Sequence, residues 1–467
     1  MSDLQRKLLR QGRGAGFRAA LDAGRTARAD VLDCVLNDPR WDRQVEVRDD
    51  YYARLLLGAD GDIEVLGRYV VEVKDEADKA DLWLPIGVLA ELSRHGANSA
   101  RLAMSEAVRK GERWRACLDA LEAAGGADLI HQVVNAEIEQ ALVARVGVEQ
   151  IAEAVTVVAA PWERWAEQIP ALMFVVNSAG SGEPRRTSGP VAWAASRIRD
   201  PKLPGNLAAL SSEFVLAQAS TPGAATKLSD ELTRRTDTNT RRLLSAAADS
   251  GTIDERYVAL RALGKHGSTE FVGAAEEFLR HESTLAPTER REHRLRQAFL
   301  RYLEELSPSQ TLPLARAWLF EPWPLSMAAE HILARHATAE DRQMLETAGV
   351  AALENGDMYR LCSIVDAINA AGPEVSLPFL TQVYEHAPYS YARRRVVSAM
   401  SRCSFADAAK PYLSEALWDC EPESRELACG ATGKSRDLTR ARIEQIARDD
   451  FEDTAVRDAA RAALDVP

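Results

Sequence analysis

A repeat that returns about every 32 residues in the C-terminal half of the chain constrains the fold most strongly. It can be anchored on Arg256, Arg296, Ser326, Leu361, Arg393, Arg425 and Arg457. Three residues after each anchor the residue is apolar: Ala259, Phe299, Ala329, Ile364, Val396, Ala428 and Ala460. Seven residues after each anchor it is apolar again, except at Thr432: Leu263, Leu303, Leu333, Ile368, Met400, Thr432 and Leu464. This spacing predicts an all-α fold, an α-solenoid (superhelix) of helical hairpins in which each unit buries its apolar stripe on its neighbours.

Each anchor helix is followed by a short turn and a second amphipathic segment, so that the repeating unit is a helical hairpin. These second segments span 270–280, 341–353, 375–386, 409–418 and 438–449. The position six residues after each anchor is small in most repeats, which suits the close approach of a neighbouring helix: Ala262, Tyr302, Ile332, Ala367, Ala399, Ala431 and Ala463. Residues typical of helix entries precede or open the anchor helices: Asp254, Pro388, Pro422 and Asp453.

Two segments carry a resemblance to a known family. Residues 453–464 (DTAVRDAARAAL) and 256–264 (RYVALRALG) resemble HEAT-like repeats, most closely the short bacterial kind that is also found in phycobilin lyases. The resemblance covers about residues 251–467 and implies an α-solenoid. It departs from the family pattern at Ser326 and Leu361, where the arginine is missing, which leaves the contact between neighbouring repeats open at these two steps.

The rest of the chain divides into two less regular parts. Residues 1–176 are predicted to be a divergent helical-repeat region, with amphipathic segments at 41–57, 79–94, 98–110 and 112–124. Arg48 can serve there as an anchor, with Tyr51 and Leu55 at the apolar offsets and Arg54 at the small one. Residues 177–250 are predicted to be a connector, with a Gly/Ser/Pro-rich loop at 177–190 and an irregular or loosely helical stretch at 219–252. Residues 251–467 are predicted to be the HEAT-like repeat array.

Charge and cysteine usage restrict the class of protein. The formal net charge is −12, which disfavours general binding to nucleic acids or membrane surfaces because phosphate contacts need clustered Lys and Arg. A small local excess of basic residues in 181–250 is interpreted as solvated helix faces. The six cysteines form no C-x-x-C pair, and no apolar leader follows the basic N-terminal residues. A cytoplasmic protein with reduced cysteines is therefore expected.

No local motif predicts a catalytic residue, a metal ligand or a cofactor. Residues 428–435 (ACGATGKS) end like a phosphate-binding P-loop, but Ala428 stands where the motif needs its first glycine, and the preceding residues belong to the helix ladder. The eight histidines form no H-E-x-x-H pattern. An enzyme is therefore not favoured, although a site assembled from distant residues stays open.

Aromatic and basic residues are the remaining candidates for function. Trp and Tyr are favoured anchors for a bound partner, although such residues more often belong to the core. The candidate partner-binding residues are Trp162, Trp165, Arg185, Arg186 and Arg394. Further tryptophans with the same two interpretations are Trp323, Trp41 beside Asp42, and Trp418 beside Asp419.

The favoured function is a non-enzymatic scaffold or adaptor that binds a partner protein along the concave solenoid surface. Because the chain is acidic, the partner is expected to present basic or mixed segments; nucleic acid, a membrane and a small-molecule ligand are not expected. One alternative is an enzyme on a HEAT-like frame, such as an alkylpurine DNA glycosylase, with Trp418–Asp419 or Trp41–Asp42 as its candidate pairs. Another, suggested by the resemblance alone, is a lyase or chaperone-like module.

Overall fold

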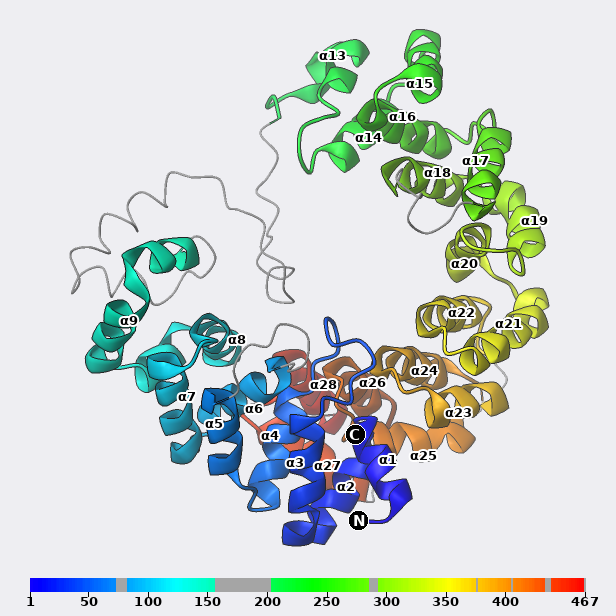
Figure 1. Ribbon diagram of the computed structural model, residues 1–467. Helices are drawn as coiled ribbons and strands as arrows, with labels where there is room; N and C mark the ends of the chain where they lie inside the picture. The colour runs from blue at the N-terminus through cyan, green and yellow to red at the C-terminus, as the bar shows by residue number, and fades with distance from the viewer. Residues whose placement is uncertain are drawn as a thin grey trace. The chain divides into compact units, whose positions relative to one another are not determined.

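The computed structural model describes residues 1–72, 82–155, 203–284, 293–374, 377–404, 406–432 and 438–465. Over these residues every regular element is a helix, and no β-strand occurs. The helices pack in neighbouring pairs (Figure 1). The prediction of an all-α fold is therefore confirmed for the described part of the chain.

The described residues group into two compact units. Unit 1 takes them from 1–155, 387–401 and 406–465, and unit 2 from 203–386 and 402–404. The helices of unit 1 are α1 (Asp3–Arg10), α2 (Gly14–Ala23), α3 (Arg28–Leu36), α4 (Asp49–Gly58), α5 (Ile63–Glu72), α6 (Trp83–Arg94), α7 (Asn98–Lys110), α8 (Trp114–Val133), α9 (Ala136–Val155), α24 (Ser390–Arg402), α25 (Ala406–Ala416), α26 (Pro422–Thr432), α27 (Leu438–Arg448) and α28 (Thr454–Leu464). Those of unit 2 are α13 (Ser212–Ala217), α14 (Ala225–Thr233), α15 (Thr238–Ser250), α16 (Ile253–Lys265), α17 (Val272–Thr284), α18 (His293–Glu305), α19 (Pro308–Trp318), α20 (Leu325–His336), α21 (Arg342–Glu354), α22 (Met358–Ala370) and α23 (Leu377–His386).

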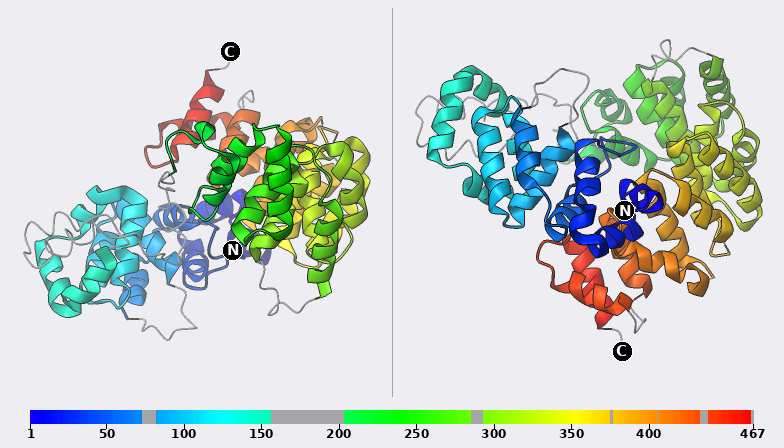
Figure 2. Two further views of the ribbon diagram at one scale, coloured as in Figure 1. Left: turned by 90° about the horizontal axis from the view of Figure 1, so that it is seen from above. Right: turned by 60° about the horizontal axis from the view of Figure 1, so that its bottom comes forward.

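The predicted ladder corresponds to one helix of each pair. All seven anchors lie on even-numbered helices, from Arg256 on α16 to Arg457 on α28. Within unit 2, α14, α16 and α18 pack in succession, and α15, α19 and α21 each cover the helix that follows (Figure 2). Every residue three positions after an anchor is buried, and so is every residue seven positions after one except Leu464, which is half-buried. The polar exception, Thr432, is also buried, because its hydroxyl donates to the Ala428 carbonyl at 2.6 Å.

Two of the anchor arginines hold the turn before the next anchor helix. Arg393 contacts Asp419 just before α26, and Arg425 contacts Glu452 just before α28. Where the pattern lacks its arginine at Leu361, the preceding Arg360 takes a related role: it donates to Glu330 at 2.9 Å and to the Leu319 carbonyl at 2.6 Å. At this step a neighbouring guanidinium therefore joins α22 to the preceding repeat.

Two segments differ from the sequence-based expectation. Residues 41–48, expected to open a helix, form a loop, and α4 begins only at Asp49. The stretch 219–252, expected to be irregular or loosely helical, contains the regular helices α14 and α15, and α13 precedes it; Ser211 caps the start of α13 and Asp237 that of α15. Such caps satisfy backbone N–H groups that the helix itself leaves without partners.

Unit 1 is discontinuous in sequence, because its N-terminal helices pack against its C-terminal ones. The Cys420 amide donates to the Gly12 carbonyl at 2.9 Å, and Arg13 forms an ion pair with Glu415 at 2.9 Å. Gly14 allows this approach, since a Cβ there would lie only 2.0 Å from the Glu415 carbonyl oxygen. Figure 2 shows the blue helices beside the orange ones. The compact units therefore cut across the predicted array 251–467, whose last repeats lie in unit 1.

Across the described residues, none of the helices is both long enough and apolar enough to cross a lipid bilayer.

Candidate binding surfaces

The structure places only one of the five candidate partner-binding residues. Trp162, Trp165, Arg185 and Arg186 lie outside the described residues, as does the 177–190 loop. Arg394 lies on the first turns of α24. Of the five candidates, Arg394 in unit 1 is thus the one whose surroundings the structure describes.

The 38–48 loop of unit 1 has its backbone fixed from the inside. The Glu46 side chain is buried, and its Oε1 accepts hydrogen bonds from the Trp41 amide at 2.7 Å and the Asp42 amide at 2.9 Å. Arg40 donates to the Glu46 carbonyl at 3.0 Å and pairs with Asp38 at 2.6 Å. These bonds give the loop one conformation without a helix or a strand.

The same loop exposes apolar side chains. Trp41 is 37% exposed, Val45 39% and Val47 55%. Val45 and Val47 flank the buried Glu46, so that alternate residues point outward. Apolar side chains gathered on one ordered loop are more informative than isolated ones, because soluble proteins rarely leave contiguous apolar surface without a use.

Two tyrosines and Arg394 extend this surface toward α24. The Trp41 and Tyr389 ring centroids are 4.8 Å apart, and Tyr389 stacks on Tyr391 at 5.5 Å with an interplanar angle of 11°. The Arg394 guanidinium lies 4.6 Å from the Tyr391 ring centroid and pairs with Glu423 at 3.0 Å. We call Trp41, Tyr389, Tyr391 and Arg394 the aromatic row. Tyr389 is its buried centre, whereas the other three reach solvent.

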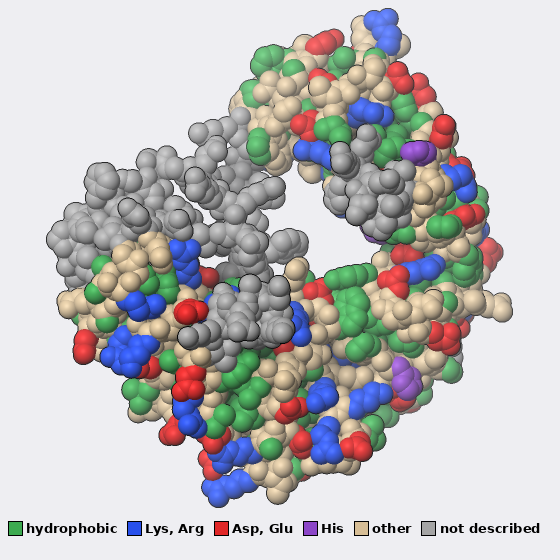
Figure 3. Space-filling view, viewed as in Figure 1, with side chains coloured by type: hydrophobic (Ala, Val, Ile, Leu, Met, Phe, Trp, Pro, Cys, Tyr) green, Lys and Arg blue, Asp and Glu red, His purple; other side chains and the backbone are tan. Residues whose placement is uncertain are grey.

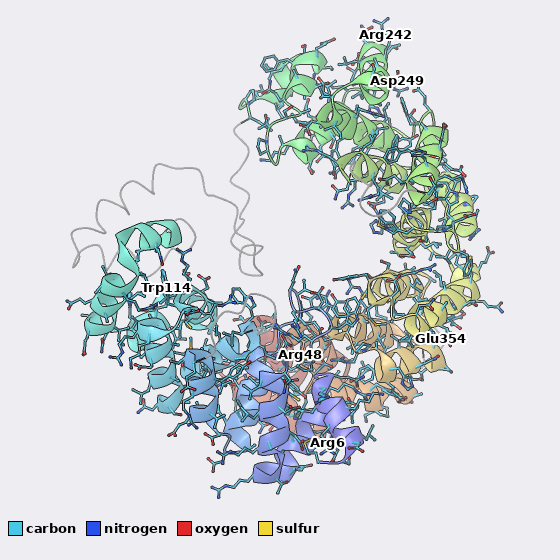
Figure 4. All side chains as sticks on the ribbon, viewed as in Figure 1. Arg6, Arg48, Trp114, Arg242, Asp249 and Glu354 are labelled. Atoms are coloured by element: carbon cyan, nitrogen blue, oxygen red, sulfur yellow. The ribbon has the colours of Figure 1, made fainter. Side chains whose placement is uncertain are left out.

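A buried polar network supports the aromatic row. Glu46 Oε2 accepts from Arg48 at 2.5 Å and from the Ser390 hydroxyl at 2.6 Å. Ser390 also contacts Glu421. Arg48, labelled in Figure 4, is fully buried and donates to the Arg10 carbonyl. The network joins the 38–48 loop to the start of α24, and so it fixes the two halves of the row relative to each other.

The pKa values of the two carboxyl groups in this network, Glu46 and Glu421, are shifted in opposite directions. Burial raises the pKa of Glu421 to about 7, with the nearby charges of Asp419 and Glu46 adding to the effect. Burial also opposes ionisation of Glu46, but the Arg48 charge and the Ser390 hydrogen bond outweigh it, so that the pKa of Glu46 is lowered. Glu46 is therefore ionised and Glu421 holds a proton until near neutral pH.

In the candidate pair Trp418–Asp419, the two side chains lie in different environments. Asp419 is buried, and its carboxylate accepts from Arg393 at 3.2 Å and from the Glu421 amide at 3.0 Å. The Trp418 side chain instead lines a surface groove. Asp419 is not among the described residues that line this groove. In the other pair, Asp42 accepts from the Gln44 amide at 2.9 Å within the loop. Both aspartates thus have structural partners, and DNA glycosylase activity stays a prediction that this geometry does not support.

Charge is distributed evenly over the face shown in Figure 3, where acidic and basic side chains are interspersed. A nucleic-acid interface needs basic residues gathered on one face. Among the described residues of this face, Figure 3 shows no such stripe.

Three side chains that sequence motifs could not connect form a cluster in unit 1. A carboxylate oxygen of Asp50, a carboxylate oxygen of Glu91 and a ring nitrogen of His95 all lie within 4.8 Å of one another. Arg94 donates to Glu91 at 2.6 Å and to Asp50 at 3.3 Å, and Arg54 donates to Asp50 at 2.6 Å. Arginine side chains thus pair with both carboxyl groups, and the cluster is accounted for as an ion-pair network.

The P-loop-like residues lie partly outside the described chain. Residues 422–432 form helix α26, so that Ala428 belongs to a helix, as expected. Gly433, Lys434 and Ser435 follow it and are not among the described residues. A phosphate-binding P-loop follows a β-strand, and the helix before this segment does not provide one.

A comparison of the sequence with protein-family models and with curated proteins finds no match.

Proposed function

We propose that the protein is a non-enzymatic scaffold or adaptor that binds a partner protein through the aromatic row and the neighbouring valines of the 38–48 loop. In this proposal the hairpins form a HEAT-like α-solenoid that acts in the cytoplasm. One observation carries the proposal: Trp41, Val45 and Val47 are exposed on a loop whose backbone is fixed by the buried Glu46.

Pre-organisation gives this loop its value as a binding element. A flexible loop loses conformational entropy when it binds, whereas a loop already held in one conformation does not. Tryptophan and tyrosine bury a large area with few rotatable bonds and dominate the energetics of many interfaces. The loop and the row therefore combine a rigid frame with suitable anchor side chains.

The charges around the row indicate the chemistry of the partner. Glu423, beside Arg394, is half exposed, and Asp42 lies next to Trp41 in the loop. The whole chain carries a net charge of −12. An apolar partner segment flanked by basic residues would fill the row and be steered toward it by charge.

The experiment compares partner capture by three forms of the tagged full-length protein in its own cells. The test variant is Trp41→Ala combined with Val47→Ser. The control is Leu102→Ser, because Leu102 is 71% exposed on α7 in the same unit, away from the loop. The wild type and L102S should retain the same co-purifying protein, which the W41A/V47S variant loses.

Loss of this protein from the control as well, or its retention by the double variant, would contradict the proposal. Val47 is mostly exposed, but Trp41 packs on Tyr389, so that the double variant should lose about 0.5–3 kcal/mol of unfolding free energy and remain folded. An unfolding curve therefore distinguishes loss of binding from loss of fold.

A further inference from the structure

A groove of about 450 Å³ lies in unit 1 between α2, α4 and α27. Phe17, Leu21 and Trp418 form its apolar part, while Arg54, Arg442 and Arg448 reach it from α4 and α27. Arg18 lines an adjoining pocket that shares Leu21, Trp418 and Arg442 with it. Small-molecule sites are commonly concave, largely apolar and of this size, with a few convergent polar groups.

Three of the cations at the groove form no direct ion pair with any described residue. Among the described residues, Arg18, Arg442 and Arg448 form no ion pair with a carboxylate, whereas Arg54 pairs with Asp50 and Asp449. Of the other acids at the groove, Glu444 forms an ion pair with Arg440 at 3.5 Å. The remaining acid is Asp22, which lines the adjoining pocket. In a chain with a net charge of −12, a groove with surplus arginines is an exception that calls for an anion.

Trp418 organises two of these arginines. The Arg18 guanidinium lies 5.1 Å and the Arg442 guanidinium 5.5 Å from its ring centroid. Arg442 also donates to the Leu417 carbonyl at 3.3 Å, which fixes its head group. Burial, followed by the charge of Arg425, lowers the pKa of Arg442 to about 10. A guanidinium in this position would be stabilised by an added negative charge.

The geometry points to the groove as a binding site for a small organic phosphate, of the class of the nucleoside phosphates. Guanidinium groups present paired donors that match phosphate oxygens, and they also stack on flat rings. The phosphate would contact Arg18, Arg442 and Arg448, and the organic part would pack on the apolar side chains. This inference is independent of partner binding at the aromatic row.

Direct binding measurements on the full-length protein test the inference, with ATP and inorganic pyrophosphate as probes in isothermal titration calorimetry. The test variants are Arg18→Gln and Arg448→Gln, because both side chains are exposed and carry no ion pair in the described part of the chain. The control is Arg461→Gln on α28, which makes the same charge change at an exposed position. Each test variant should weaken ATP binding about 10-fold, the size expected for a lost hydrogen bond to a charged group, and the control should bind like wild type.

ATP should also bind more tightly than pyrophosphate, since only ATP can use the apolar wall. Three results would overturn the inference. The first is the lack of saturable ATP binding below about 1 mM, which corresponds to about the weakest affinity of a specific site. The second is wild-type affinity in both test variants, and the third is equal affinity for the two probes. All three readouts are independent of partner capture, so that failure here leaves the proposed function untouched.

Discussion

Ser390 has one hydroxyl proton but lies within hydrogen-bond distance of two carboxyl groups, Glu46 and Glu421. It can donate to only one of them. Because the pKa of Glu46 is lowered and that of Glu421 is raised to about 7, the consistent arrangement is a chain. Protonated Glu421 donates to the Ser390 hydroxyl, which donates to the Glu46 carboxylate. A single proton thus completes the buried network beneath the aromatic row.

This arrangement predicts a pH-dependent effect of Glu421→Gln. The pKa of Glu421 is raised from 4.5 to about 7 in the folded protein, so that its proton stabilises the fold fully below pH 4.5. The stabilisation is lost as the pH rises from 4.5 through 7. Glutamine keeps a donor for Ser390 and has no proton to lose. The free energy of unfolding of E421Q should therefore exceed that of wild type progressively over this range, by up to about 3 kcal/mol at pH 8.

Urea denaturation between pH 5 and pH 8 measures this difference. Glu423→Gln is the matched control, because Glu423 lies two residues further along on the first turn of α26, is half exposed and is outside the buried network. Its unfolding free energy should run parallel to that of wild type. Parallel curves for E421Q as well would show that Glu421 is ionised across the range, and would refute the proton chain.

At the scale of the element, α16 and α18 approach closely at Gly264. A Cβ at this position would lie 2.6 Å from the Tyr302 carbonyl oxygen and 3.1 Å from the Glu305 Cβ. The backbone oxygen of a packed helix cannot yield as the end of a side chain can. The glycine therefore serves helix packing, although it lowers the helix propensity of α16.

Gly264→Ala should destabilise the protein by about 1–3 kcal/mol, the usual range for overpacking, despite the higher helix propensity of alanine. Gly273→Ala is the control, since Gly273 lies in α17 of the same unit and a Cβ there meets no atom within 4 Å. It should be neutral or slightly stabilising. Thermal unfolding followed by circular dichroism measures both, and a stability of G264A equal to that of G273A would refute the close packing.

The position of each helix and its buried face are also the features that the sequence predicts best. Apolar residues three and seven positions after each anchor mark the buried stripe directly, because a helix places these offsets on one face. The segment 98–110 agrees with α7, and 341–353 differs from α21 by one residue at each end. The prediction of a helix over 41–57 is wrong for residues 41–48, because the order of this loop comes from the buried Glu46, which the local hydrophobic pattern does not show.

At the scale of the whole molecule, the contacts that define unit 1 join residues about 400 positions apart in the chain. No periodic pattern encodes such pairs. Both surfaces discussed here belong to this class: the aromatic row joins Trp41 to Tyr389, and the groove joins Leu21 to Trp418. The sequence could therefore single out Arg394, Trp41 and Trp418 as candidates, but the structure was needed to show their neighbours.

The pair of Arg13 and Glu415 tests whether the two ends of the chain act as one unit. It is bidentate, with Nε to Oε1 and Nη2 to Oε2 both at 2.9 Å, and both side chains are largely shielded from water. Loss of either charge leaves the other half-desolvated without its partner. Arg13→Gln and Glu415→Gln should each destabilise unit 1, and the double variant should cost less than their sum. The coupling expected for residues in direct contact is about 0.5–3 kcal/mol.

Hydrogen exchange locates the effect. The Cys420 amide, bonded to the Gly12 carbonyl, reports contact between the two ends of the chain. In R13Q the exchange of peptides covering 406–432 should accelerate together with that of peptides covering 14–23, because cooperative units open as a whole. Acceleration limited to the neighbourhood of residue 13 would mean that the C-terminal repeats of unit 1 are stable without the N-terminal helices. Joint acceleration would instead mean that the fold of the last repeats depends on the first.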